Sequence, residues 1–182
     1  MSFNEKAVIM NRDGVSRAIR RMAHEVLEAN GGTDDLVILG IQRRGVPLAA
    51  QLREAIKSVE GEEPPIGAID ITFYRDDLSK LGPSPRVATT EMPLDVTDKV
   101  VILVDDVLYT GRTVRAALDV IMDWGRPRCI QLAVLVDRGH RELPIRPDYV
   151  GKNVPTSHKE VIKVKVMEFD DKQEVVVGEV RN

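Results

Sequence analysis

The chain has 182 residues and a formal net charge of −3, with 43% hydrophobic and 30% charged residues. This composition is ordinary for a globular protein, and the net charge gives no overall attraction for nucleic acid. No apolar run is long enough to span a membrane, the N-terminus lacks the apolar core of a signal peptide, and the single Cys129 excludes an intramolecular disulfide. We therefore expect one domain over residues 1–182, a cytoplasmic location and no membrane partner.

Helical and strand-like patterns alternate along the chain. Apolar residues recur with helical spacing over 11–30, 46–59 and 113–124. Apolar, β-branched runs predict buried strands over 36–39, 66–73, 100–104 and 130–136, with a short strand or arm over 7–10. The C-terminal part predicts a hairpin of two strands, 161–169 and 174–180.

The alternation of strands and helices predicts an α/β fold with a mostly parallel, twisted sheet flanked by helices. Ligands of such sheets bind at the carboxyl ends of the strands. Residues 74–98 lack any clear period and contain three prolines, which is typical of a lid or a disordered connection. Residues 137–158 also predict irregular structure.

An acidic pair, Asp105 and Asp106, follows the apolar strand 100–104 and precedes a loop of small residues and a helix. Backbone N–H groups at a helix start bind phosphate, and Gly111 lets the backbone close around the anion. The hydroxyls of Thr110 and Thr113 can add further donors. Carboxylates repel a phosphate, so the two acidic side chains must face another part of the ligand. The hydroxyls of a ribose, with a divalent cation nearby, would suit them. The alternative is an acidic strand end that turns into solvent.

A second candidate loop, Gly40–Gly45, follows the strand 36–39. Its glycines allow close approach of the backbone, and Arg43 and Arg44 supply charge and bidentate hydrogen bonds, so the loop suits a pyrophosphate group. Arg75, in the long irregular stretch, is a candidate for a lid contact to the same group. The alternative for both is a solvated surface with exposed arginines.

The string Asp105–Thr113 resembles the phosphoribosyl-pyrophosphate (PRPP) signature of the type I phosphoribosyltransferases, although Tyr109 stands where most of these enzymes carry a small residue. The resemblance implies the fold of that family, with a lid over about 74–98 and a small hood formed by about 137–160 and the C-terminal strands. It also implies Mg²⁺, bound mainly through PRPP and with no protein ligand assigned.

Together, the motifs and the resemblance assign the site residues. The predicted PRPP-binding residues are Arg43, Arg44, Asp105, Asp106, Val107, Leu108, Tyr109, Thr110, Gly111, Arg112 and Thr113. The predicted catalytic residues are Asp105, Asp106 and Arg75. The resemblance places the acceptor base against the start of the hood, at Val136, Asp137 and Arg138.

The helix 11–30 carries basic residues opposite its apolar face. Farther along, residues 126–159 contain seven Lys and Arg against three acidic residues, so a basic region is set into an acidic chain. A solvated surface is one interpretation, and binding to the backbone and loops of a folded RNA is the other. On this helix the candidate RNA-binding residues are Arg17, Arg20, Arg21 and His24.

Three strings, 70–78, 105–116 and 137–146, resemble the PyrR family of bacterial bifunctional regulators. The resemblance implies a UMP- or UTP-dependent protein that binds the leader mRNA of pyrimidine operons and controls their expression by attenuation. It also implies uracil phosphoribosyltransferase activity, in which uracil and PRPP give UMP and pyrophosphate, and a homodimer or homotetramer. The RNA-facing surface that the resemblance implies includes Arg21, His24, Arg141, Arg146 and Lys152. The alternatives are a salvage phosphoribosyltransferase for a purine or another base, and a regulator with an inactive site.

Overall fold

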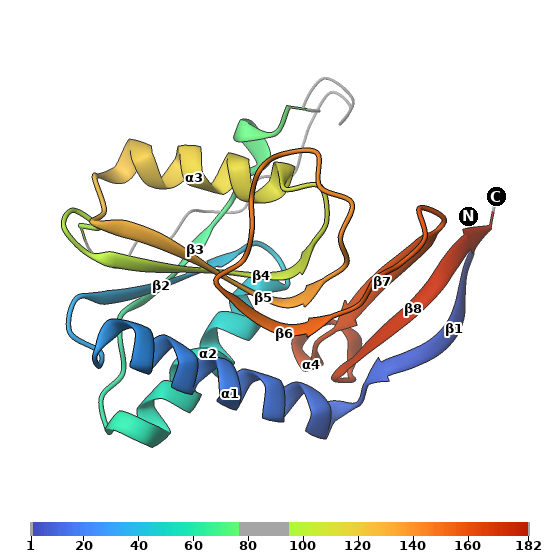
Figure 1. Cartoon of the computed structure of the whole chain (residues 1–182), viewed down its shortest axis with the longest axis horizontal. Coiled ribbons are helices and arrows are strands. Elements are labelled where there is room, and N and C mark those ends of the chain that lie inside the picture. Colours follow the sequence, from blue (N-terminus) through green and yellow to red (C-terminus); the bar gives the residue numbers. More distant parts are fainter. Residues whose placement is uncertain (1, 77–94, 182) are drawn as a thin grey trace.

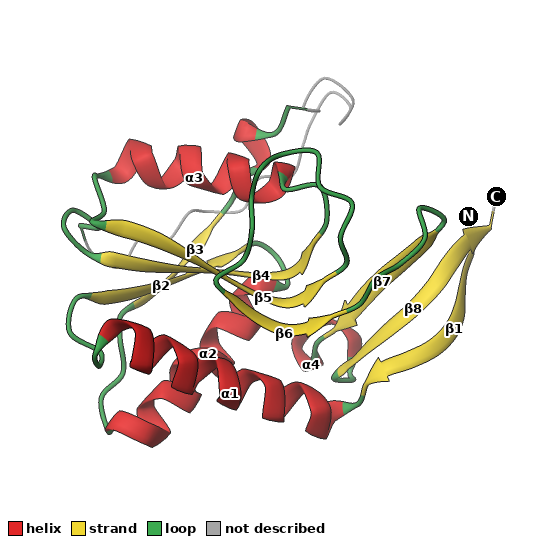
Figure 2. Cartoon of the chain, viewed as in Figure 1, coloured by secondary structure: helices red, strands yellow, loops and turns green. Residues whose placement is uncertain are grey.

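The computed structural model describes residues 2–76 and 95–181, so most of the predicted lid lies outside the described residues. Figures 1 and 2 show a layered α/β body with a smaller sheet projecting from one side. The strands are β1 (Ser2–Met10), β2 (Leu36–Ile41), β3 (Ile66–Ile69), β4 (Val100–Leu108), β5 (Cys129–Asp137), β6 (Tyr149–Asn153), β7 (Glu160–Lys165) and β8 (Glu174–Arg181). The helices are α1 (Arg12–Asn30), α2 (Gly45–Glu60), a 3₁₀ turn η1 (Thr72–Tyr74), α3 (Arg112–Trp124) and α4 (Met167–Asp170).

The main sheet has five parallel strands in the order β3-β2-β4-β5-β6, which confirms the predicted parallel α/β architecture. Helices α1 and α2 cover one face and α3 covers the other (Figure 1). Alternate residues of β4 point into two separate cores: Ile102 packs under α1 and α2, whereas Leu103 packs under α3. This burial on both faces explains why β4 is a continuous apolar run.

The first helix forms as its pattern predicts. Asn11 caps its N-terminus by accepting a hydrogen bond from the N–H of Gly14 at 2.9 Å, and Gly31 ends it with a positive φ of 69°. Val15, Ile19 and their apolar neighbours on the same face are buried. None of the helices in the described part of the chain is long and apolar enough to cross a bilayer.

The smaller sheet is antiparallel, with the order β1-β8-β7. The predicted C-terminal hairpin is confirmed by the pairing of β7 with β8. The arm near the N-terminus is a nine-residue strand that pairs with β8, with Phe3 opposite Val180. Both ends of the described chain therefore lie side by side (Figure 1).

Several predicted boundaries are wrong. The strand predicted over 66–73 ends at Ile69, because the Asp70 carboxylate accepts the N–H of Thr72 at 2.8 Å and turns the chain into η1. The strand predicted over 161–169 ends at Lys165 and gives way to α4. The region predicted as irregular contains β6, which joins the main sheet beside β5. The acidic pair does not follow β4 but lies within it.

Candidate functional site

A cavity of about 710 Å³ opens at the carboxyl ends of β2, β3 and β4. It brings together residues that were predicted from separate motifs: the arginines Arg43, Arg44 and Arg75 and the carboxylates of Asp105 and Asp106. The remaining residues of its lining are Gln42, Asp70, Ile71, Thr72, Val107, Thr113 and Phe169. The position agrees with the expectation that ligands bind at this edge of a parallel sheet.

Glycines bring the arginine loop into contact with β4. A Cβ atom on Gly45 would lie 2.4 Å from the carbonyl oxygen of Val104, and one on Gly40 would lie 2.6 Å from the Cα of Val46. Neither position tolerates a side chain without a shift of the backbone. The close approach places the start of α2 and the two arginines beside the acidic pair.

Asp105 is buried, whereas Asp106 is partly exposed beside it. Asp105 is only 6% exposed, and burial, together with the neighbouring Asp106 carboxylate, raises its pKa well above the ordinary value. Burial also raises the pKa of Asp106, although the N–H of Val107, which donates to its Oδ1 at 2.8 Å, opposes the rise. Buried carboxylates of this kind are stabilised by a ligand that brings hydroxyl donors or positive charge.

The loop between β4 and α3 has the backbone expected of an anion cradle. Gly111 has a φ of 92°, a left-handed conformation that favours glycine, and Thr113 in the first turn of α3 lines the cavity. Leu108 is buried at 1% exposure, so its side chain belongs to the core. The guanidinium of Arg112 is engaged by Glu142 at 2.6 Å and by Asp76, which ties the loop to the hood and to the start of the predicted lid.

The hood is joined to this loop by backbone and side-chain hydrogen bonds. The N–H groups of Glu142 and Leu143 donate to the carbonyl of Thr110 at 3.0 and 3.1 Å. The Arg141 guanidinium donates to the Tyr109 carbonyl at 2.9 Å and to the Asp137 carboxylate at 2.5 Å. Arg141 is a predicted RNA-binding residue, but its guanidinium forms hydrogen bonds within the protein, and its side chain is only 21% exposed.

The three predicted base-binding residues do not line the 710 Å³ cavity. Val136 is fully buried within β5, and Asp137 pairs with Arg141. Arg138 is 5% exposed: it donates to the carbonyl of Glu160 at 2.6 Å and stacks 4.0 Å from the ring centroid of Tyr109. These side chains hold the hood together, and residue type alone does not distinguish this role from ligand contact.

Sequence patterns do not identify Gln42, Asp70, Thr72, Phe169 or Asp170 as site residues. Gln42 belongs to the predicted pyrophosphate loop, so its position could have identified it. Asp70 and Thr72 fall inside the strand predicted over 66–73, and only the observed end of β3 at Ile69 places them at the edge of the sheet. Phe169 gives no such signal, because only the tertiary fold brings α4 beside the arginine loop. Among the described residues no cluster of three or more His, Cys, Asp or Glu forms a metal site.

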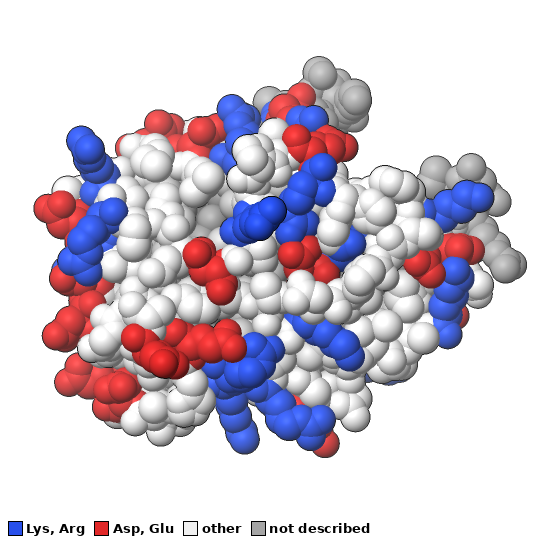
Figure 3. All heavy atoms as spheres, in the orientation of Figure 1, with Lys and Arg blue, Asp and Glu red and all other residues white. Residues whose placement is uncertain are grey.

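A second candidate surface lies at the junction of β1, α1 and β6, where a cleft of about 630 Å³ is lined by Arg17, Arg21 and Lys152. Figure 3 shows Lys and Arg side chains gathered over the N-terminal half of α1, with acidic side chains nearer its other end. Arg21 is fixed there, because it donates to the carbonyls of Val150 and Gly151 at 2.9 and 2.7 Å.

The other predicted RNA-binding residues are dispersed. His24 and Arg146 are exposed but do not line this cleft. Arg20 lines a different cavity between α1 and α2, together with Gln51 and Glu54. The fold therefore unites only three of the seven predicted residues in one cleft.

Comparison with known proteins agrees with this geometry. Residues 9–171 match the family model described as the phosphoribosyl transferase domain. "Bifunctional protein PyrR" of Pelotomaculum thermopropionicum is 60% identical over 175 residues, covering 96% of this chain and 97% of the relative. The protein of the same name from Thermus aquaticus is 58% identical over 174 residues, covering 96% of each chain.

Solved structures show the same fold at low identity. The hypoxanthine phosphoribosyltransferase of Trypanosoma cruzi superposes with a TM-score of 0.76 at 18% identity, covering 96% of each chain. A hypoxanthine-guanine phosphoribosyltransferase from Bacillus anthracis gives a TM-score of 0.70 at 19% identity, covering 97% of this chain and 99% of that one. The fold, the site and the sequence relatives together assign this chain to the phosphoribosyl transferase family and, within it, to the PyrR family.

Proposed function

We propose that this protein is a uracil phosphoribosyltransferase that also binds the leader mRNA of pyrimidine operons and regulates their expression by attenuation when UMP or UTP is bound. The observation that carries the enzymatic part is the meeting of Arg43, Arg44, Arg75, Asp105 and Asp106 in one cavity. This set offers cations to a pyrophosphate and buried carboxylates to a ribose, which are the two groups that PRPP presents.

In the proposed reaction a ring nitrogen of uracil displaces pyrophosphate from C1′ of the ribose. The bond from C1′ to the pyrophosphate oxygen breaks, the bond from C1′ to nitrogen forms, and the nitrogen loses its proton. Positive charge develops on the ribose, where Asp105 and Asp106 stabilise it, and negative charge develops on the leaving group, where the arginines do so. No protein nucleophile is required, because positioning and electrostatics supply the rate.

Mg²⁺ suits this site when it arrives with PRPP. The ion prefers oxygen ligands and is usually bound by one or two carboxylates and the phosphates of a substrate, and the cavity offers the desolvated acidic pair. When bound, Mg²⁺ neutralises charge on the pyrophosphate leaving group.

The regulatory part of the proposal rests on the basic cleft and on the connection between the phosphate loop and the hood. Arg17, Arg21 and Lys152 offer positive charge to RNA phosphates. A nucleotide in the loop would order Tyr109 and Thr110, whose carbonyls hold the hood segment that carries Arg141. Prior ordering of the hood would lower the entropic cost of RNA binding.

The first test is an assay of UMP formation from uracil and PRPP with Mg²⁺, with hypoxanthine and guanine as competing bases. Formation of UMP alone supports the enzymatic part, and turnover of a purine contradicts it. The second test is gel-shift titration of the leader RNA of the protein's own pyrimidine operon, with and without UMP at fixed salt. An unchanged dissociation constant contradicts the nucleotide-dependent regulation. Light scattering of the purified protein tests the proposed homodimer or homotetramer.

A further inference from the structure

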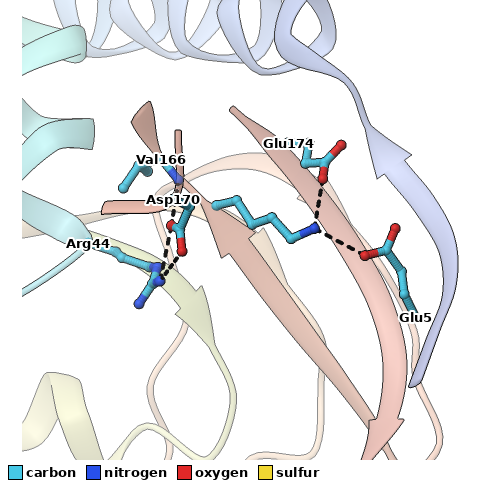
Figure 4. A network of polar contacts seen from close by, with 6 residues as sticks. Glu5, Arg44, Val166, Asp170 and Glu174 are labelled. Carbon is cyan, nitrogen blue, oxygen red and sulfur yellow. Dashed lines mark hydrogen bonds and ion pairs between the residues drawn. The ribbon is translucent and has the colours of Figure 1, made fainter. Parts of the chain in front are cut away.

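Both arginines of the pyrophosphate loop contact the short helix α4. One nitrogen of Arg44, Nη2, donates to both carboxylate oxygens of Asp170, at 2.8 and 3.0 Å (Figure 4). The guanidinium of Arg43 lies 4.9 Å from the centre of the Phe169 ring. The two contacts link segments that are separated by 126 residues in the chain.

Asp170 is itself held in place. Burial disfavours its charged form, but hydrogen bonds from the Val166 N–H, at 3.0 Å, and from Arg44 outweigh this and lower the pKa of the carboxyl. Lys165, at the end of β7, forms ion pairs with Glu174 of β8 at 2.7 Å and with Glu5 of β1 at 3.0 Å (Figure 4). The carboxylate therefore stands on an anchored segment.

Arg44 retains donor capacity on the side of the ligand. It lines the 710 Å³ cavity and also an adjoining cavity of about 440 Å³ that it shares with Asp106 and Asp170. Its Nε is buried and has no hydrogen-bond partner among the residues that the structure describes. A buried N–H without a partner is costly, so the contact with Asp170 does not by itself satisfy this guanidinium.

We propose that Asp170 is a positioning residue of the pyrophosphate site, which fixes the Arg44 guanidinium so that its remaining donors face the ligand. Phe169 restrains Arg43 from the same helix. This inference rests on the proposed function, because it takes the pyrophosphate end of PRPP as the ligand. Without Asp170, Arg44 must lose its rotational freedom when the ligand binds, which weakens binding.

Asp170→Asn removes the charge and keeps an oxygen that can accept the Val166 N–H, so α4 has what it needs to form. The pyrophosphate group of PRPP is held in the substrate complex as well as in the transition state. Weaker binding of this group therefore affects both states equally, and we expect the KM for PRPP to rise about tenfold with little change in kcat. Glu168→Gln is the matched control, because it removes an exposed carboxylate from the same helix. It should leave KM unchanged.

The decisive experiment is a double-mutant cycle of Asp170→Asn with Arg44→Gln, read out as KM for PRPP and as calorimetric affinity for inorganic pyrophosphate with Mg²⁺. A KM effect of Asp170→Asn that disappears in the Arg44→Gln background supports the proposal. The proposal is overturned if Asp170→Asn does not change the KM for PRPP, or if its effect on KM is equally large in the Arg44→Gln background. Should Asp170→Asn lower the melting temperature, Phe169→Ala, which truncates a half-exposed ring, replaces it in a cycle with Arg43→Gln.

Pyrophosphate affinity separates this inference from the proposed function. A wild-type protein that binds pyrophosphate but does not convert uracil contradicts the proposed reaction, and weaker pyrophosphate binding by Asp170→Asn would still support the positioning role. Equal affinity of the two proteins overturns that role, and so does a wild-type protein that fails to bind pyrophosphate.

Discussion

Arg141→Gln distinguishes a residue that orders the hood from one that contacts RNA. The substitution removes the ion pair with Asp137 and weakens donation to the carbonyls of Tyr109 and Ile145, which lie 2.9 Å from the guanidinium. Both partners of the ion pair are mostly buried, with side chains 21% and 16% exposed. Charge-assisted hydrogen bonds contribute about 1.5–3 kcal/mol each, and glutamine retains one donor group, so we expect a loss of about 2–4 kcal/mol in hood stability.

Hydrogen exchange measures this loss directly. The N–H groups of Glu142 and Leu143 donate to the Thr110 carbonyl, so their exchange reports opening of the hood from the phosphate loop. A loss of about 2–4 kcal/mol accelerates exchange roughly 30-fold to several hundredfold. Arg146→Gln is the control, because Arg146 is exposed on the same segment and should leave the exchange unchanged.

The salt dependence of RNA binding completes the assay. A variant that disorders the hood should weaken binding without altering the slope of affinity against salt, whereas loss of a phosphate contact lowers that slope by about one. Unchanged exchange in Arg141→Gln, or a slope lowered by about one, would refute the reasoning.

Three further outcomes follow from the structure. Burial raises the pKa of Asp105, so protonation of this carboxyl stabilises the fold. This stability is fully present below the ordinary carboxyl pKa and is lost as pH rises through the raised pKa, so Asp105→Asn should flatten the decline in melting temperature as pH rises from the ordinary carboxyl range. Gly45→Ala places a methyl group 2.4 Å from a carbonyl of β4 and should cost about 1–3 kcal/mol in denaturant unfolding, together with most PRPP binding. Arg17→Gln should lower the salt slope of RNA binding by about one, and Arg20→Gln, from a different cavity, should not.

Local patterns predicted the parts of the fold that depend on local chemistry. The apolar run of β4 and the periodicity of α1 required no knowledge of distant segments, and the parallel sheet then placed the loop at Gly40 and the acidic pair on one edge. Contacts between distant segments were beyond such reasoning. The pairing of β1 with β8 and the approach of Asp170 to Arg44 depend on packing rather than on residues near in sequence.

The basic residues show the same limit. A helical wheel placed Arg17, Arg20 and Arg21 on one stripe, because it treats the helix as isolated. In the fold, β6 packs along one side of that stripe and α2 along the other, so Arg20 is separated from its neighbours. A charge pattern therefore identified the helix but not the group of side chains that shares a cleft.

The pairing of β1 with β8 sets an order of assembly. During synthesis β1 is made before the other described elements, but its partner β8 is the last of them. The central parallel strands have their neighbours before β8 has been made. Closing so long a loop is entropically costly, so the small sheet should be among the last elements to form. Asp170 lies in α4, which connects β7 to β8 of this late sheet. A newly made chain therefore acquires its core before it acquires the complete pyrophosphate site, and PRPP added during refolding should favour the final docking step.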